Sequence, residues 1–360
     1  MRILLSIIFL LAAIDLHATF SITAYDRTTG EWGIAVATDN IYVGNSTIYI
    51  RPGLGAFSVI AETEPRYAID GFERLLKGDD IRQAIEYTRL RDPDSTTRQV
   101  AGIDSLGRIW AFTGLHWIKW EKGSAGQIVG KDFVVMGNQL GKNVLQAMAA
   151  AFENTKGTLA SRLLAALLAG QAAGGQISGQ QSAALVVKGR NNEWFNDIDL
   201  RVDNAINPFE DLHRLLNYHY GRIRVNQALN AIRDGDTVRG ATLLLEARNM
   251  VKGWGSMQKK LARAWWLLHK EDSVVAVIHA ALNANPKWAV NLPAFYMLKD
   301  HHGMKEYIFP DRFSEKDWID AIQTTLDLQG WDAAQKPCAC GIKAYPSSGP
   351  IHDLCTPDRQ

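Results

Sequence analysis

The chain has 360 residues, of which 47% are hydrophobic, and its 39 basic and 38 acidic residues give a net charge of +1. A chain of this length fits one large domain or two ordinary ones and can bury a sizeable core. The balanced charge and the lack of a basic run argue against nucleic acid or an anionic membrane surface as a partner.

The first segment has the layout of a secretory signal peptide. A basic residue precedes a short apolar run at residues 3–14, and Ala18 stands where a small residue precedes cleavage. We therefore predict removal of residues 1–18, a mature chain that begins at Thr19, and a periplasmic or secreted location. A cut after Ala13 and an uncleaved anchor are the alternatives, although the run is too short to span a bilayer. No later stretch has the pattern of a membrane helix.

Hydrophobic patterning predicts alternating groups of strands and helices up to about residue 203. The predicted strands cover residues 19–26, 31–39, 53–63, 97–114 (as a hairpin), 132–138, 182–189 and 196–203. The predicted helices cover residues 68–78, 80–92, 141–155 and 158–173. This order suits two antiparallel sheets stacked between helical layers.

Strand signals end at Pro208, and helices follow one another after it. Two segments resemble each other, ALNAIRDGDTVRGATLLLEA and AWWLLHKEDSVVAVIHAAL, and Asp272 follows Asp236 by 36 residues in what we take as equivalent turns. A helix, a short acidic turn and a second helix at this period suggest tetratricopeptide-like repeats, with a plain helical bundle as the alternative. We expect an all-α domain over 219–335, able to bind a protein partner, and a cysteine-containing tail at 336–360.

The three cysteines, Cys338, Cys340 and Cys355, all lie in this tail. In an exported protein Cys355 would pair with Cys338 or Cys340, and closing such a loop contributes about 3 kcal/mol in the chain-entropy model. The cysteine spacing matches no zinc motif, and the pair His301-His302 has no spaced carboxylate. We therefore expect neither a metal nor a cofactor.

A threonine at a free N-terminus carries a hydroxyl and an amine on adjacent carbons. The α-amine has an ordinary pKa of about 7.7–8.0, so part of it is neutral at pH 7 and can take the hydroxyl proton. Attack on an amide would also need preorganised donors for the oxyanion. Thr19 is therefore a candidate nucleophile, although many exported proteins begin with Ser or Thr without using it.

Seven stretches between Thr19 and about Leu216 carry a family resemblance. In chain order they are TFSITAYDRTTGEWGIAVATD, VGNSTIYIRPGLGAFSVIAETEPRYAIDGFERLLKG, RQVAGIDSLGRIWAFTG, VVMGNQL, AMAAAFENTKGTLASRLLAALLAGQAAGG, GQQSAALVV and DLRVDNAINPFEDLHRLL. Together they resemble the DUF1028 family, which is assigned to the N-terminal nucleophile (Ntn) hydrolase superfamily. The resemblance implies an α+β fold, a four-layer αββα sandwich over 19–218, and Thr19 as a nucleophile exposed by processing.

The resemblance also suggests roles for residues whose motifs match. Asn138 matches the asparagine of a Gly-Asn pair and is a candidate for holding the oxyanion or orienting substrate. Thr38 and Ser182, in matching strands, are candidates for binding substrate. Two more candidates come from outside the matching motifs: Asp39, where many relatives have a basic or aromatic group, for steadying the terminal ammonium, and the acidic Glu62 for binding substrate. Four of these residues have a structural alternative: a turn cap for Asn138, a loop start for Asp39, a solvated carboxylate for Glu62 and a strand start for Ser182.

One segment departs from the family pattern, which often reads GGDxRGxQSAAL where this chain reads GGQISGQQSAAL. Gln176 and Ser178 thus replace a charged pair, so specificity differs or activity is reduced if that pair contacts substrate. We expect an exported amidohydrolase or peptidase that acts on a small amide or peptide, with envelope material as the source that the compartment suggests. The alternative is an inactive scaffold that acts through its C-terminal helices. A homo-oligomer is compatible with either.

Overall fold

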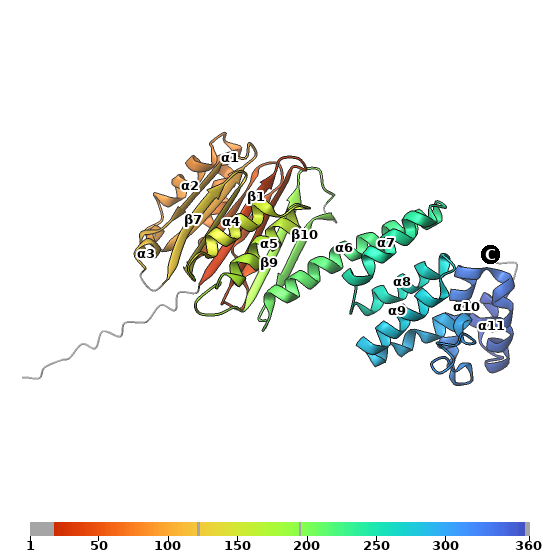
Figure 1. Ribbon diagram of the computed structural model, residues 1–360. Helices are drawn as coiled ribbons and strands as arrows, with labels where there is room; N and C mark the ends of the chain where they lie inside the picture. Colours follow the sequence, from red (N-terminus) through yellow and green to blue (C-terminus); the bar gives the residue numbers. More distant parts are fainter. Residues whose placement is uncertain (1–17, 121–122, 194–195, 357–360) are drawn as a thin grey trace, which may run out of the picture. The chain divides into compact units, whose positions relative to one another are not determined.

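The computed structural model describes residues 18–120, 123–193 and 196–356, so most of the proposed leader lies outside the described residues. The chain divides into two compact units between Leu215 and Leu216, and each is described by itself below (Figure 1).

The first unit contains two antiparallel sheets. The six-stranded sheet has the order β10-β9-β2-β1-β8-β7, and the four-stranded sheet has the order β3-β4-β5-β6. The strands of the larger sheet are β1 (Thr19–Asp26), β2 (Glu31–Thr38), β7 (Ser124–Gly130), β8 (Phe133–Leu140), β9 (Ser182–Gly189) and β10 (Ile198–Val202). Those of the smaller sheet are β3 (Ile48–Arg51), β4 (Gly55–Ala61), β5 (Arg98–Asp104) and β6 (Ile109–Thr113).

Side-chain alternation along β1 explains how the layers stack. Phe20 faces outward, where its ring approaches Gly170 of α5 (Leu159–Ala172), which packs beside α4 (Val144–Asn154). Ser21 faces inward and accepts a hydrogen bond of 3.1 Å from Ser58 on the smaller sheet. Successive residues of a strand point to opposite faces, so β1 contacts a helical layer on one side and the second sheet on the other.

Two further helices cover the outer face of the smaller sheet. Helices α1 (Arg66–Leu76) and α2 (Ile81–Arg89) pack on it through a buried cluster that includes Phe57, Tyr67 and Ile81. The unit therefore has four layers, helix–sheet–sheet–helix, as expected from the sequence (Figure 1). Each predicted strand and helix of this part has a counterpart. The strands β3 and β7 and the short helix α3 (Leu115–Ile118) were not predicted.

The second unit is helical throughout its described residues. Helix α6 (Pro208–Arg233) crosses the unit boundary, and the elements that follow are α7 (Thr237–Met250), α8 (Gly255–Leu267), α9 (Glu271–Ala284), the 3₁₀ segments η4 (Pro286–Leu298) and η5 (Pro310–Arg312), α10 (Glu315–Gln329), α11 (Trp331–Ala344) and α12 (Gly349–Leu354).

The two resembling segments form helix–turn–helix pairs, but the two aspartates are not equivalent. Asp236 caps α7 by accepting a 3.0 Å bond from the Arg239 amide, whereas Asp272 lies inside the first turn of α9. The equivalent positions are Gly235 (φ 83°) and His269 (φ 53°), which give each turn a left-handed residue. Their separation is 269 − 235 = 34 residues, the length of a tetratricopeptide unit.

A disulfide joins the last two helical segments. It links Cys338 in α11 to Cys355 after α12, with the Cα atoms 5.6 Å apart, and Cys340 is a free, half-buried thiol. The tail at 336–360 thus includes most of α11 and all of α12. Across the described residues, no helix combines the length and apolarity that crossing a membrane requires.

Candidate functional site

Strand register brings four polar side chains into one row. Thr19 pairs with Thr38 on β2 and with Asn138 on β8, and Thr38 pairs with Ser182 on β9. Directly opposed residues of antiparallel strands share a face of the sheet. The row therefore lies on the same face as Ser21, which is the face toward the second sheet, and all four side chains are buried.

The Thr19 hydroxyl contacts the Thr38 hydroxyl, with their Oγ1 atoms 3.1 Å apart. Thr38 Oγ1 donates to the carbonyl oxygen of Ala18 at 2.7 Å and accepts from the Asn40 amide at 3.3 Å. A hydroxyl has one proton to donate, and that of Thr38 is given to Ala18. With residue 18 attached, the Thr19 hydroxyl must therefore donate its proton toward Thr38.

A second side chain reaches the Ala18 carbonyl oxygen from a distant part of the chain. The Nε2 of Gln176 donates to it, and the side chain of Gln176 is buried. Gly174 and Gly175 precede it with φ values of 115° and 48°, a conformation that glycine adopts without steric cost. These two glycines follow α5 and place Gln176 in a bridge with Leu140 at the end of β8.

Asn138 is held in one orientation by Gln99 of the second sheet. Asn138 Nδ2 donates to Gln99 Oε1 at 2.8 Å, and Gln99 Nε2 donates to Thr113 Oγ1 at 3.1 Å and to the Gly137 carbonyl at 2.9 Å. Among the described residues, the buried Oδ1 of Asn138 has no hydrogen-bond partner. Because this unpaired atom is an acceptor, Asn138 is suited to an ammonium group more than to an oxyanion.

The Gly-Asn pair has a steric basis. A Cβ at Gly137 would lie 2.9 Å from both the Thr19 carbonyl oxygen and Phe20 Cβ. Only glycine therefore lets β8 approach β1 closely enough to set Asn138 opposite Thr19.

A cavity of about 150 Å³ lies beside Thr19. Among the described residues that line it, Glu62 is charged and the others are neutral. The lining comprises Thr19, Thr38, Asn40, Tyr42, Val43, Ser46, Thr47, Ala61, Glu62 and Thr63. A larger cavity of about 280 Å³ lies in the second unit, where residues between Arg248 and Trp288 line it.

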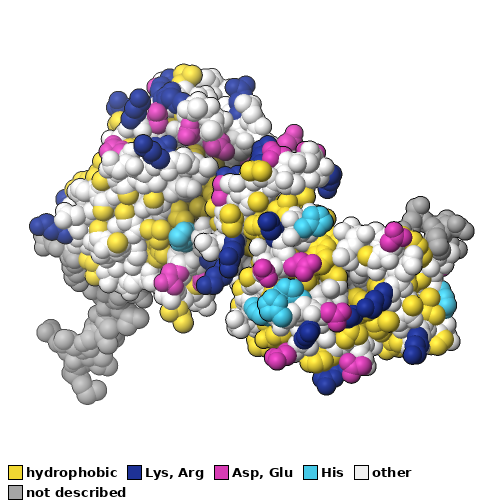
Figure 2. All heavy atoms as spheres, turned by 45° about the vertical axis from the view of Figure 1, so that its right-hand side comes forward, with side chains coloured by type: hydrophobic (Ala, Val, Ile, Leu, Met, Phe, Trp, Pro, Cys, Tyr) yellow, Lys and Arg dark blue, Asp and Glu magenta, His cyan; other side chains and the backbone are white. Residues whose placement is uncertain are grey.

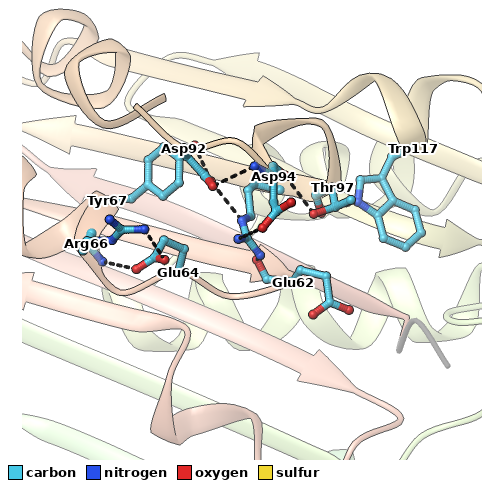
Figure 3. Close-up of polar contacts among 9 residues, drawn as sticks. Glu62, Glu64, Arg66, Tyr67, Asp92, Asp94, Thr97 and Trp117 are labelled. Carbon is cyan, nitrogen blue, oxygen red and sulfur yellow. Dashed lines mark hydrogen bonds and ion pairs between the residues drawn. The ribbon is translucent and has the colours of Figure 1, made fainter. Parts of the chain in front are cut away.

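A buried ion pair fixes the strand end that carries Glu62 (Figure 3). Arg98 donates from Nη1 to the Glu62 carbonyl at 2.9 Å and from Nε to Asp92 Oδ2 at 3.0 Å. Asp92 also accepts from the Tyr67 hydroxyl at 3.1 Å. Burial alone would raise the pKa of Asp92, but hydrogen bonds from Arg98 and the Asp94 amide lower that pKa below its ordinary value. Figure 3 shows the Glu62 carboxylate pointing away from this cluster.

The sequence-predicted residues therefore separate in space. Thr19, Thr38 and Glu62 line the cavity, and Asn138 lies opposite Thr19 without lining it. Asp39 lies in the bend after β2 and does not line the cavity. Ser182 donates from Oγ to the carbonyl oxygen of residue 40 at 2.7 Å and accepts from the amide of residue 43 at 2.9 Å, so its hydroxyl serves the local backbone.

Sequence reasoning missed two glutamines of the site. Gln99 received no role, although a glutamine inside a strand of buried apolar residues is itself a signal. Gln176 was noted only as a departure from the family pattern, and no pattern indicated that it reaches Ala18.

One further group of possible metal ligands lies in the second unit. Asp272, His301 and His302 place ligand atoms within 4.8 Å of one another, so the expectation that no carboxylate accompanies the histidine pair is wrong. His301 Nδ1 accepts from the Gly303 amide at 3.2 Å, which leaves the ring proton on Nε2, 3.5 Å from Asp272 Oδ1. This arrangement is that of an N–H···O contact, and Asp272 and His302 are exposed. Figure 2 shows histidine and acidic side chains next to one another on the surface of the helical unit.

Comparison with known proteins identifies the family to which the sequence of the first unit is similar. The model of a family of unknown function, DUF1028, matches residues 19–212. The crystal structure of protein SPO2555 from Silicibacter pomeroyi, also of DUF1028, is 31% identical with a TM-score of 0.50, over 55% of this chain and 84% of that one. No curated protein matches the chain. The chain therefore belongs to the DUF1028 family.

Proposed function

We propose that the first unit is an N-terminal-threonine amidohydrolase of the Ntn type, active once residues 1–18 are removed. The observation that carries this proposal is the setting of Thr19. It is the first residue of the central strand pair, its hydroxyl contacts a second hydroxyl at 3.1 Å, and it borders a cavity. Cleavage before Thr19 would convert its amide nitrogen into an amine beside that hydroxyl.

The reaction passes through an acyl-enzyme ester. Thr19 Oγ1 forms a bond to the substrate carbonyl carbon, and its proton moves to the neutral α-amine. The C–N bond of the substrate then breaks, and the leaving amine takes that proton. Water next attacks the ester and gives a proton to the same α-amine. The bond from carbon to Oγ1 breaks, Oγ1 recovers the proton, and the carboxylic acid leaves.

Asn138 would hold the terminal amine in place. Its unpaired Oδ1 is an acceptor on the strand position directly opposite Thr19, and Gln99 prevents the amide from turning. An acceptor there binds the protonated amine and orients the lone pair of the neutral one. Asp39 does not line the cavity, so it would act on the terminal amine from outside it.

The cavity limits the substrate to a small amide or peptide. Its volume of about 150 Å³ is below the roughly 300–1,000 Å³ of sites for drug-sized ligands. Thr38 would contact the substrate carbonyl, and Glu62 would attract a cationic group. The disulfide and the apolar leader support a periplasmic or secreted location, where envelope peptides are available.

Two chains that differ by one alanine test the proposal. The first is made to begin at Thr19 and the second at Ala18, with both start sites verified by intact mass. We expect turnover of a panel of small amides and dipeptides only from the chain that begins at Thr19, because only that chain has the free amine. Equal turnover by both chains, or none by either, would contradict the proposal.

A second candidate function, a scaffold that acts through its helices, is favoured by the larger cavity. Arg248 and Lys252 line it together with amide side chains such as Asn249, and no carboxylate is among the described residues that line it. Such a cationic hollow suits a peptide that ends in a free carboxylate.

Charge reversal tests this binding. We expect a fluorescent acidic tetrapeptide with a free C-terminus to bind the wild-type chain, and its affinity to fall at least about tenfold in Arg248→Glu/Lys252→Glu. Fluorescence anisotropy at two salt concentrations measures the change. The control is Lys270→Glu, a charge reversal in the other turn that lies away from the cavity. An equal loss of affinity in Lys270→Glu would rule out the cavity lined by Arg248 and Lys252 as the binding site.

A further inference from the structure

The Ala18 carbonyl oxygen marks a place where two donors converge. Thr38 Oγ1 donates to it at 2.7 Å, and Gln176 Nε2 donates to it from another part of the chain. Both side chains are more than nine-tenths buried, with exposed fractions of 2% for Thr38 and 6% for Gln176. Two fixed donors that meet at one oxygen in a buried site are what an acyl-transfer reaction needs to stabilise an oxyanion.

This carbonyl also lies next to the Thr19 hydroxyl. The Ala18 carbonyl carbon is bonded directly to the Thr19 nitrogen, and Thr38 Oγ1 contacts both the Ala18 oxygen and Thr19 Oγ1. A carbonyl group that replaced that of Ala18 after processing would therefore lie close to the nucleophile, with its oxygen against the same two donors.

We propose that Thr38 and Gln176 bind the substrate carbonyl in the mature protein and stabilise the oxyanion that forms on it. This inference rests on the proposed function and names the substrate class: amides whose acyl group is as small as the alanyl group of Ala18. The Ala18 side chain is fully buried in this position. The adjoining cavity of about 150 Å³ borders Thr19 and is left for the rest of the substrate.

Thr38 and Gln176 have a different role from that of Asn138. Thr38 and Gln176 supply hydrogen-bond donors, which an oxyanion requires, whereas the free atom of Asn138 is an acceptor. The role that the Gly-Asn resemblance suggested for Asn138 in holding the oxyanion thus belongs to Gln176. This assignment gives Gln176, which departs from the family pattern, a role in catalysis.

The test uses the full mature chain that begins at Thr19. The substrates are the p-nitroanilides of alanine and leucine, and the probe is the boronic acid analogue of N-acetylalanine, whose adduct on Thr19 is tetrahedral. We expect Gln176→Leu and Thr38→Val each to lower kcat about a hundredfold with little change in KM. The same variants should lower the affinity for the boronic acid by a similar factor. The wild-type chain should hydrolyse the alanine p-nitroanilide faster than the leucine p-nitroanilide.

Two controls separate catalysis from folding. Thr38→Ser keeps the hydroxyl and should recover most of the activity. Gln180→Leu removes a nearby glutamine that donates instead to the Ile206 carbonyl, and it should leave kcat unchanged. Wild-type turnover with normal kcat in Gln176→Leu would overturn this inference while leaving the proposed function intact. A wild-type chain that neither turns over amides nor forms the boronate adduct would overturn both.

Discussion

Replacing Thr19 with alanine in the mature chain is expected to lower kcat for amide hydrolysis at least about a thousandfold. The substitution removes the oxygen that forms the acyl-enzyme ester and leaves the amine of residue 19 in place. Neither Thr38 nor Gln176 can replace it, because both are assigned as donors to the carbonyl oxygen. The measurement is single-turnover and steady-state hydrolysis, together with intact mass to detect the acyl-enzyme in the wild-type chain.

Two variants on the same strand serve as controls for this result. Thr19→Ser keeps a hydroxyl beside the amine and should retain activity within about a hundredfold of wild type. Thr23→Ala removes another buried threonine hydroxyl from the same face of β1, and it should change stability without changing the chemical step. Full activity in Thr19→Ala would show that Thr19 is not the nucleophile.

Replacing Asp92 with asparagine is expected to destabilise the first unit by about 3 kcal/mol. The Asp92 side chain is 1% exposed and that of Arg98 is 11% exposed, so the change leaves a nearly buried guanidinium without its closest carboxylate. Arg98 also holds the Glu62 carbonyl, so the cavity wall should loosen with it. The measurement is unfolding in urea, monitored by hydrogen exchange of the β4 and β5 amides. These amides report the stability of the first unit alone.

The pH dependence of this effect has a definite sign. The pKa of Asp92 is lowered by folding, so its contribution to stability is complete above the pKa of the unfolded chain, about 3.9. That contribution is lost as the pH falls from there through the lower folded pKa. The difference in free energy of unfolding between the wild-type chain and Asp92→Asn should therefore have its full value at pH 6 and should become smaller below about pH 4.

Asp94 supplies the matched control. Its carboxylate lies 3.7 Å from Arg98 Nη2 but is 70% exposed, so Asp94→Asn should cost less than about 1 kcal/mol. Equal effects of the two substitutions would show that the buried ion pair contributes no more than a surface charge does.

The fold was predictable where residue type and turn residues give clear signals in the sequence. The hairpin of β1 and β2 was anticipated because polar and apolar residues alternate along β1 and turn residues separate it from β2, and that of β5 and β6 because the turn residues of 104–107 separate two largely apolar runs. Strand β3 was missed because its four residues are all half-buried or exposed and show no period. Strand β7 was missed because three glycine and alanine residues weaken its pattern at the sheet edge.

The site was predictable only in part, because its contacts join segments that are distant in sequence. The free hydroxyl and amine of a terminal threonine indicated Thr19, and the hairpin brings Thr38 opposite it. No local pattern shows that β8 pairs with β1 in the register that sets Asn138 against Thr19. Gln176 was beyond prediction because two left-handed glycines turn the chain before it, and the sequence does not show where that turn leads.

The contact between Ala18 and its two donors has a consequence for the timing of activity. While residue 18 is attached, its own carbonyl fills the place of a substrate carbonyl, and the Thr19 nitrogen is an amide without a basic lone pair. Breaking one peptide bond supplies the base and vacates the donors in the same event. On the proposed function, the newly made chain is thus self-inhibited, and hydrolysis begins only where the leader is cut.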